Sequence, residues 1–222
     1  MLSRKQFLAA SAAGSAAVTT PVLTWRTGLN NGTYNSSTTT YDYGNISIGT
    51  ASSDRYVIAH MTGFDNFNVV SAPTVTFDGN SPDEIQVGSG ALPGGWAWKK
   101  ITSGTTTNIK VNYGQSLSVT NGLGVWTATS LNVGDDVDND FVFSSTAAAL
   151  SVSSSTSSLY PTIMMGVSIS FTAGRTWTNL TEDYDITFFT GASDSFAANS
   201  GAQTISTDNP GTANALWVLS FH

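Results

Sequence analysis

Short runs of alternating apolar and polar residues dominate the chain from Trp25 to its end. In residues 73–78, for example, Val75 and Phe77 alternate with threonine, and the run stops at Gly79. A period of two is typical of a β-strand that buries one face. Runs that predict strands, with turn residues between them, occupy positions 45–48, 55–61, 73–78, 95–98, 108–113, 125–129, 140–143, 166–171, 185–189 and 215–221.

This spacing of strands predicts an all-β fold. Many short strands with turn signals between them are typical of an antiparallel β-sandwich, here of a jelly-roll-like kind. The last run, 215–221, carries apolar residues at odd and even positions alike, so we expect a strand that is covered on both faces. No linker divides the region, and we expect residues 25–222 to form a single β-sandwich domain.

Residues 1–24 form a separate segment, rich in alanine up to residue 17. Ser3 and Gln6 have the spacing of a capping box, and Leu2 and Phe7 have the spacing of a hydrophobic staple. We therefore expect a short anchor arm, helical or extended, that packs on a neighbouring subunit. Its predicted contact residues are Arg4, Lys5, Phe7 and Leu8.

The same segment has a second interpretation as an export signal. Residues 3–8 resemble the twin-arginine pattern, with Lys5 in the place of the second arginine, and residues 10–12 read Ala-Ser-Ala, which suits cleavage. This interpretation predicts an exported hydrolase whose mature chain begins near residues 13–21.

Composition narrows the possible folds and partners. Only 10% of the residues are charged and the chain has no cysteine, whereas about a quarter is usual for charged residues. Serine and threonine must supply the polar surface, which excludes a helical bundle and favours sheets. The lack of cysteine excludes a disulfide scaffold. A net charge of −7 argues against a nucleic-acid partner, and no apolar run is long enough for a transmembrane helix.

Groups that could support catalysis are scarce. The chain has two histidines, and it contains no G-x-S-x-G elbow and no P-loop. His60 lies in an apolar strand pattern, where a structural role is expected. We therefore predict that the protein is not an enzyme and needs no cofactor.

The densest acidic cluster is a candidate metal site. Asp136, Asp138 and Asp140 begin like a calcium-binding loop, but Phe141 stands where the turn glycine belongs and Ala147 where the bidentate glutamate belongs. Two interpretations stay open, an adventitious Ca²⁺ on a surface turn and a solvated acidic turn that leads into the strand at Phe141.

Two tryptophans form a candidate contact site. Trp96 and Trp98 share one face of a predicted strand, and Lys99 and Lys100 follow them. An exposed pair would stack on sugar rings or anchor a protein partner. In the alternative interpretation, which we favour, both rings belong to the core.

One stretch carries a family resemblance. Residues 49–55 read Gly-Thr-Ala-Ser-Ser-Asp-Arg between two strand patterns, and the stretch resembles one in small β-sandwich structural proteins of marine tailed bacteriophages. The apolar ending at 215–221 is similar to theirs. The resemblance implies a virion component. The residues also allow a physical account, in which Asp54 caps the turn and Arg55 pairs with a carboxylate at a strand end.

The resulting expectation is a capsid decoration or cement protein at the virion surface. It would bind the major capsid protein or another virion protein through its arm, as a homotrimer or another symmetric homo-oligomer. The alternative is a receptor-binding tail-fibre or spike domain, or a secreted carbohydrate-binding adhesin.

Overall fold

The fold is given by a computed structural model, which describes residues 20–65, 69–131, 137–144, 149–154, 156, 161–169, 175–186, 188–208 and 214–221. In this part of the chain all the regular secondary structure consists of β-strands, so the predicted all-β class is confirmed. The first half contains β1 (Val22–Asn30), β2 (Thr33–Asn35), β3 (Thr40–Ser47), β4 (Tyr56–Phe64), β5 (Thr74–Phe77), β6 (Glu84–Gly88), β7 (Gly94–Lys100), β8 (Thr106–Asn112) and β9 (Thr120–Thr129). The second half contains β10 (Val137–Ser144), β11 (Leu150–Ser154), β12 (Thr162–Ile169), β13 (Trp177–Thr178), β14 (Thr181–Ile186), β15 (Phe189–Phe196), β16 (Gln203–Thr207) and β17 (Asn214–Phe221).

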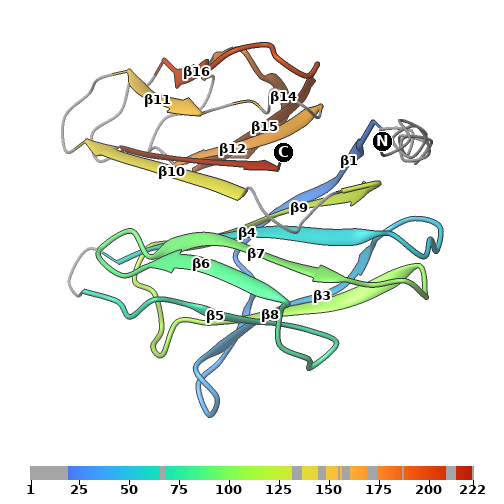
Figure 1. The fold of residues 1–222 in the computed structure, drawn as a ribbon. Helices are drawn as coiled ribbons and strands as arrows, with labels where there is room; N and C mark the ends of the chain where they lie inside the picture. The colour runs from blue at the N-terminus through green and yellow to red at the C-terminus, as the bar shows by residue number, and fades with distance from the viewer. Residues whose placement is uncertain are drawn as a thin grey trace, which may run out of the picture.

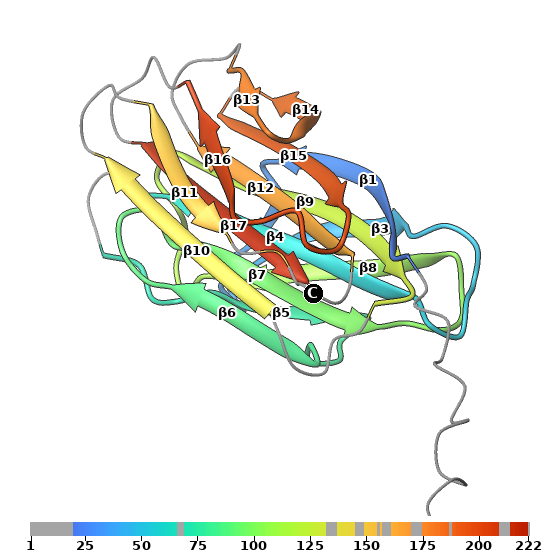
Figure 2. The same ribbon diagram turned by 45° about the horizontal axis from the view of Figure 1, so that its top comes forward.

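These strands form four antiparallel sheets, two from each half of the chain. Sheet I has the order β2-β3-β8-β5 and sheet II the order β1-β9-β4-β7-β6. Sheet III has the order β10-β17-β12-β15-β14 and sheet IV the order β11-β16-β13. Three core clusters lie between successive sheets, so the sheets stack in the order I, II, III, IV (Figures 1 and 2). The predicted β-sandwich is confirmed, and the structure adds that two sandwiches are packed on each other.

The central strands of sheets II and III are buried on both faces. In β4 the odd residues Val57 and Ala59 belong to the core against sheet I, whereas the even residue Ile58 belongs to the core against sheet III. In β17, Trp217 faces sheet II and Val218 faces sheet IV. The expectation that the last strand is covered on both faces is therefore confirmed.

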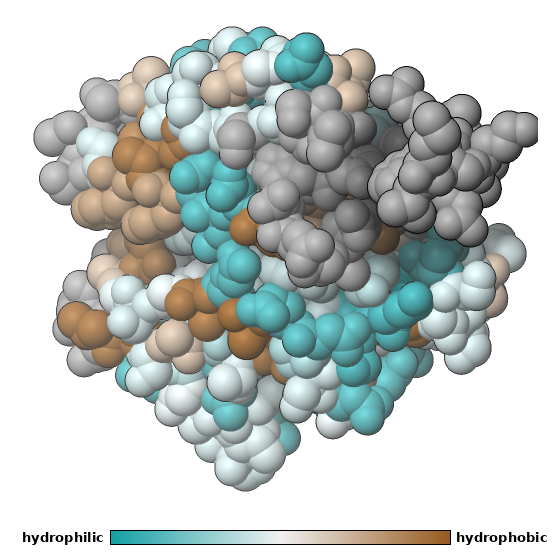
Figure 3. All heavy atoms as spheres, viewed as in Figure 1, coloured by the Kyte–Doolittle hydropathy of each residue, from teal (hydrophilic) through white to brown (hydrophobic). Residues whose placement is uncertain are grey.

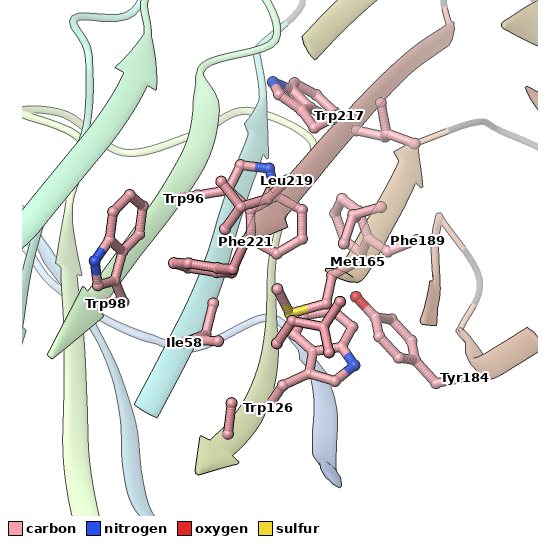
Figure 4. Close-up of a cluster of buried hydrophobic side chains, with 14 of the residues drawn as sticks. Ile58, Trp96, Trp98, Trp126, Met165, Tyr184, Phe189, Trp217, Leu219 and Phe221 are labelled. Atoms are coloured by element: carbon pink, nitrogen blue, oxygen red, sulfur yellow. The ribbon is translucent and has the colours of Figure 1, made fainter. Parts of the chain in front are cut away.

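An aromatic core joins sheets II and III. Figure 4 shows Trp98 of sheet II facing Phe221 of sheet III, and their ring centroids are 5.2 Å apart in an edge-on arrangement. Trp126 of β9 packs against Tyr184 of β14 at 6.0 Å and donates a hydrogen bond from Nε1 to Asp183 Oδ2 at 2.8 Å. Aromatic pairs of this geometry contribute about 0.5–1.5 kcal/mol each beyond their buried area. The two halves of the chain are thus held face to face by their largest side chains.

Glycines make room for these rings. A Cβ atom at Gly122 of β9 would lie 2.6 Å from Cδ2 of Phe189, and one at Gly28 of β1 would lie 2.6 Å from Cδ2 of Tyr184. Both distances are shorter than real Cβ contacts allow. The backbone of sheet II therefore forms shallow sockets for aromatic residues of sheet III, which is a common use of glycine inside strands.

The stretch that carries the family resemblance has a structural role. Arg55 is buried, and its guanidinium donates to backbone carbonyls of two loops. The shorter of these hydrogen bonds run from Nη1 to Thr50 O at 2.7 Å and to Gly49 O at 2.8 Å, from Nε to Ile101 O at 2.9 Å and from Nη2 to Ser103 O at 2.9 Å. The expected pairing of Arg55 with a carboxylate is wrong, because carbonyls of the two loops already use its donors.

The Asp54 side chain caps its own turn through a hydrogen bond, as the sequence indicated. Its carboxylate accepts a hydrogen bond from the Ser52 hydroxyl and another from the Ser130 backbone amide at 2.9 Å. These contacts lower the pKa of the Asp54 carboxyl below its usual value, the bond from Ser52 having the largest effect. The turn is thereby tied to the end of β9.

The boundary of the predicted arm differs slightly from expectation. β1 begins at Val22 and pairs with β9, so the last three residues of the segment 1–24 belong to sheet II. The predicted contact residues Arg4, Lys5, Phe7 and Leu8 lie outside the described residues.

The glycine sockets give a stability prediction. Gly122→Ala places a methyl group against the Phe189 ring, and we expect it to lower the free energy of unfolding by about 1–3 kcal/mol. Gly88→Ala is the matched control, because nothing lies within 4 Å of a Cβ atom at that position. Urea unfolding of both variants measures the effect. Equal stabilities for the two variants would contradict the role given to the sockets.

Candidate functional site

The candidate site is the open edge of sheet III, formed by β10. This strand pairs with β17 over eight residues, from Val137 to Ser144. Its other side pairs with no strand within the described part of the chain. A strand edge of this kind presents free N–H and C=O groups that can pair with another extended segment.

Two exposed phenylalanines lie on one face of this edge. Phe141 and Phe143 expose 52% and 50% of their surface. They lie on the face of sheet III that is turned toward sheet II, and the Phe141 ring is 5.1 Å from the ring of Trp217. On this side of the molecule, Figure 3 shows apolar side chains on both halves of the chain. Exposed apolar patches of this kind are typical of contact sites.

The opposite face of the same edge is acidic. Asp138 is exposed and Asp140 is half-buried, and both lie on the face turned toward sheet IV. Burial raises the pKa of the Asp140 carboxyl, and the charge of Asp138 adds to this effect, while a hydrogen bond with Ser154 opposes it. A cation that docked on this face would relieve the repulsion between the two carboxylates.

The metal-site interpretation fits this geometry poorly. Asp136 lies outside the described residues, and Asp138 and Asp140 lie within β10 instead of in a turn. Alternate residues of a strand are about 6–7 Å apart along its axis, so they do not wrap around one ion as a calcium loop does. Among the described residues no three His, Cys, Asp or Glu side chains are grouped as metal ligands. The interpretation as a solvated turn placed the start of the strand at Phe141. This boundary is wrong, because the strand begins at Val137.

Trp96 and Trp98 are core residues. Both are buried between sheets II and III, so the interpretation as an exposed pair is wrong and the favoured alternative holds. Their faces point toward sheet III because even positions of β7 share the face of even positions of β4.

The two lysines that follow these tryptophans are engaged elsewhere. The Lys99 ammonium donates to Ser81 O at 2.7 Å and pairs with Asp83 at 3.3 Å. The Lys100 ammonium lies 5.7 Å from the centroid of the Tyr56 ring. The four candidate residues were Trp96, Trp98, Lys99 and Lys100, and the structure therefore does not bring them into one contact site.

His60 is part of the aromatic core. It is fully buried, and its ring centroid lies 4.7 Å from that of Trp96 and 5.0 Å from that of Trp217. Neither of its ring nitrogens has a hydrogen-bond partner. Burial lowers its pKa to about 3, so the imidazole is neutral near pH 7. Without solvent contact or a polar partner, His60 acts in packing.

Phe141 and Phe143 were not predicted as a surface. The sequence did contain a signal for them, because Phe141, Val142 and Phe143 are three consecutive apolar residues next to an acidic run. In a strand, such a run must place an apolar residue on each face. If the strand lies at a sheet edge, one of those faces is poorly covered.

No protein-family model matches the chain, and no curated protein matches it. None of the described residues belongs to a helix with the length and hydropathy needed to span a membrane.

His60 makes stability depend on pH. Its pKa is about 3 in the folded protein and about 6.5 in an unfolded chain. The unfolded state therefore binds a proton first as the pH falls below about 6.5, which destabilises the fold progressively down to about pH 3. Between pH 7 and pH 4.5 this loss is about 2–3 kcal/mol.

The variant His60→Phe tests this dependence. Between pH 7 and pH 4.5 the free energy of unfolding should fall in both proteins. The fall should be smaller in His60→Phe than in the natural chain, by about 2–3 kcal/mol. Trp96→Phe is the control, because it trims the same cluster and keeps the imidazole, so its pH dependence should match the natural chain. Urea unfolding at the two pH values checks both. An unchanged pH dependence in His60→Phe would show that His60 is not the group responsible.

Proposed function

We propose that this chain is a non-enzymatic structural protein of a tailed-phage virion, a decoration protein that stabilises the head shell by contact. The observation that carries the proposal is the β10 edge, where Phe141 and Phe143 are exposed on a strand whose outer side pairs with no other strand of the described residues. It offers a surface for binding by shape and strand pairing, without chemistry on a substrate. The resemblance at residues 49–55 supports a virion setting.

The distribution of charge supports a docking role for the arm. Residues 1–19 carry Arg4 and Lys5 and no acidic side chain, whereas the rest of the chain carries six basic and fifteen acidic side chains. The arm therefore differs in sign from the body. A basic arm with apolar residues, attached to an acidic domain, is better suited to binding other subunits than to packing on its own domain.

The core is consistent with a structural role that requires a stably folded protein. Three hydrophobic layers lie between four sheets, and the chain contains no cysteine whose oxidation state could alter them. A protein that binds only the assembled shell stabilises that shell by mass action. A stable attachment of this kind buries about 1,200–2,000 Å² in total.

The alternative function as a glycan-binding adhesin or receptor-binding domain loses its most specific support. It rested on an exposed Trp96 and Trp98, which are both buried, and on the many Asn, Asp and Tyr residues expected in loops, which would suit many kinds of surface. We therefore propose the decoration function alone.

Removal of residues 1–19 tests the proposal. We expect the truncated chain to lose binding to shells assembled without this protein, because the arm supplies the attachment. Co-sedimentation with such shells measures binding, and circular dichroism confirms that the sheets are retained.

A matched pair of full-length variants provides the control. Arg4→Gln with Lys5→Gln should weaken binding at least tenfold, and Ser11→Gln with Ser15→Gln, which leaves the arm's charge intact, should not. If the truncated chain decorates shells at full occupancy, the proposed role of the arm is wrong.

A further inference from the structure

We propose that the chain contains two copies of one eight-stranded jelly-roll unit, and that the contact between sheets II and III is the interface through which each copy binds the other. The first unit spans residues 20–131 and the second residues 137–221. The partner of each unit is therefore the other unit of the same chain. This interface is separate from the surface proposed for virion binding, so it holds whatever the whole chain attaches to.

The strand order is the same in both units. When the strands of each unit are numbered from its start and β2 is left out, sheets II and III both have the order first, eighth, third, sixth and fifth strand. Sheet I without β2 (β3-β8-β5) and sheet IV (β11-β16-β13) both have the order second, seventh and fourth. Eight strands divided in this way between two sheets are typical of a jelly roll. Every strand of the second unit thus has a counterpart in the first.

Side chains at corresponding positions of sheets II and III are also alike. On the faces that meet, one row of cross-strand neighbours has an aromatic residue on the first strand, a tryptophan on the eighth and a branched aliphatic residue on the third. The rows are Trp25, Trp126 and Ile58 in sheet II and Phe141, Trp217 and Val167 in sheet III. Because cross-strand neighbours determine the packing surface of a sheet, the two faces share a side-chain pattern as well as a topology.

The two sheets stack as the partners of a twofold dimer do. In one contact, Gly122 of β9 forms the socket for Phe189 of β15. In another, Trp98 of β7 packs on Phe221 of β17. Exchanging each strand for its counterpart in the other unit turns the contact of β9 with β15 into the contact of β17 with β7. A twofold interface requires this reciprocity, and both contacts are present.

Each unit has a core and strand ladders of its own. The core between sheets I and II draws only on the first unit, and the core between sheets III and IV only on the second. Among the described residues, no strand of one unit pairs with a strand of the other. The units meet through the aromatic core and the hydrogen bond from Trp126 to Asp183. Obligate dimers have interfaces of this apolar kind, which resemble a domain core cut in half.

The twofold relation fails at one position, and this explains the exposure of Phe141. The row that contains Phe141 ends on the fifth strand of sheet III at Tyr184, whereas the corresponding row of sheet II ends at Glu84. The Tyr184 ring stacks on Trp25 at 6.1 Å between centroids. On the opposite side of the molecule, where β10 lies above β6 (Figures 1 and 2), Phe141 has Glu84 as its corresponding partner. Phe141 exposes 52% of its surface, against 37% for Trp25.

Cleavage between the two units tests the interface in the full chain. A protease recognition sequence is inserted at residues 132–136, between β9 and β10, and the purified protein is cut there. Size-exclusion chromatography with light scattering should show both fragments in a single complex with one copy of each. After separation in urea, the fragments should form that complex again when the urea is removed. Fragments that elute apart, or that do not recombine, would overturn the inference.

The control is a cut inside one unit, at the exposed turn between Asn199 and Ser200 that joins β15 and β16. This cut divides the sheets of the second unit, so its fragments should recombine at least fivefold less after the same treatment. Equal recovery from both cuts would contradict the division into two units.

Variants of a glycine socket test whether the aromatic core provides the binding. In the chain cut between the units, Gly122→Ala should raise the dissociation constant of the two fragments at least fivefold, because the added methyl group meets the Phe189 ring. Gly88→Ala, where a Cβ atom has no neighbour within 4 Å, should leave the constant unchanged. Equal dissociation constants for the two variants would show that the units are not joined through these sheets.

The full-length variant Glu84→Tyr tests the twofold relation itself. A tyrosine at this position should cover Phe141 as Tyr184 covers Trp25, and it should raise the urea concentration at the midpoint of unfolding. The gain should vanish in the Phe141→Ser background. Ile85→Tyr is the control, because Ile85 lies on the opposite face of β6, and its effect should not depend on Phe141. A Glu84→Tyr effect that is absent, or that is the same with and without Phe141, would refute the twofold relation.

Discussion

The structure depends on the aromatic contact between sheets II and III. Each of these sheets already has a partner on its outer side, and each presents a second apolar face that a single sandwich would leave in water. Trp126 and Trp98 of one sheet and Tyr184 and Phe221 of the other fill the space between them. Because glycines lie beneath some of these rings, the backbones can approach closely enough for the rings to touch across the layer.

This contact accounts for the unusual composition. The central strands β4, β9, β12 and β17 are covered on both faces and contain no Asp, Glu, Lys or Arg. An ionised side chain at such a position would need a partner or a neutralising pKa shift. His60 shows the second outcome, because its imidazole is neutral between Trp96 and Trp217. Arg55 shows the first, because carbonyls of two loops satisfy its guanidinium.

Much of the strand pattern could be read from the sequence, but the layers could not. Residues 55–61 and 215–221 were expected to be strands and correspond to β4 and β17. Alternation shows that a side chain is buried, but it does not show which sheet covers it. Val57 and Ile58 look alike in sequence, yet they face different sheets, because long-range pairing decides the stacking. For the same reason the exposed Phe141 was read as an ordinary strand residue, while the buried Trp98 could have been either core or surface.

The layers also determine where charge and function can lie. The four central strands β4, β9, β12 and β17 contain no charged residue, and several acidic residues lie on edge strands, among them Asp138 of β10, Glu182 of β14 and Glu84 of β6. Negative charge on an edge disfavours pairing with an identical edge of another copy. The segment before β1 has the opposite balance, because residues 1–19 contain Arg4 and Lys5 and no acidic residue. Charged residues that do lie in the interior, such as Arg55 and Arg175, are held by backbone carbonyls or by a carboxylate, whereas acidic residues at sheet edges can be solvated.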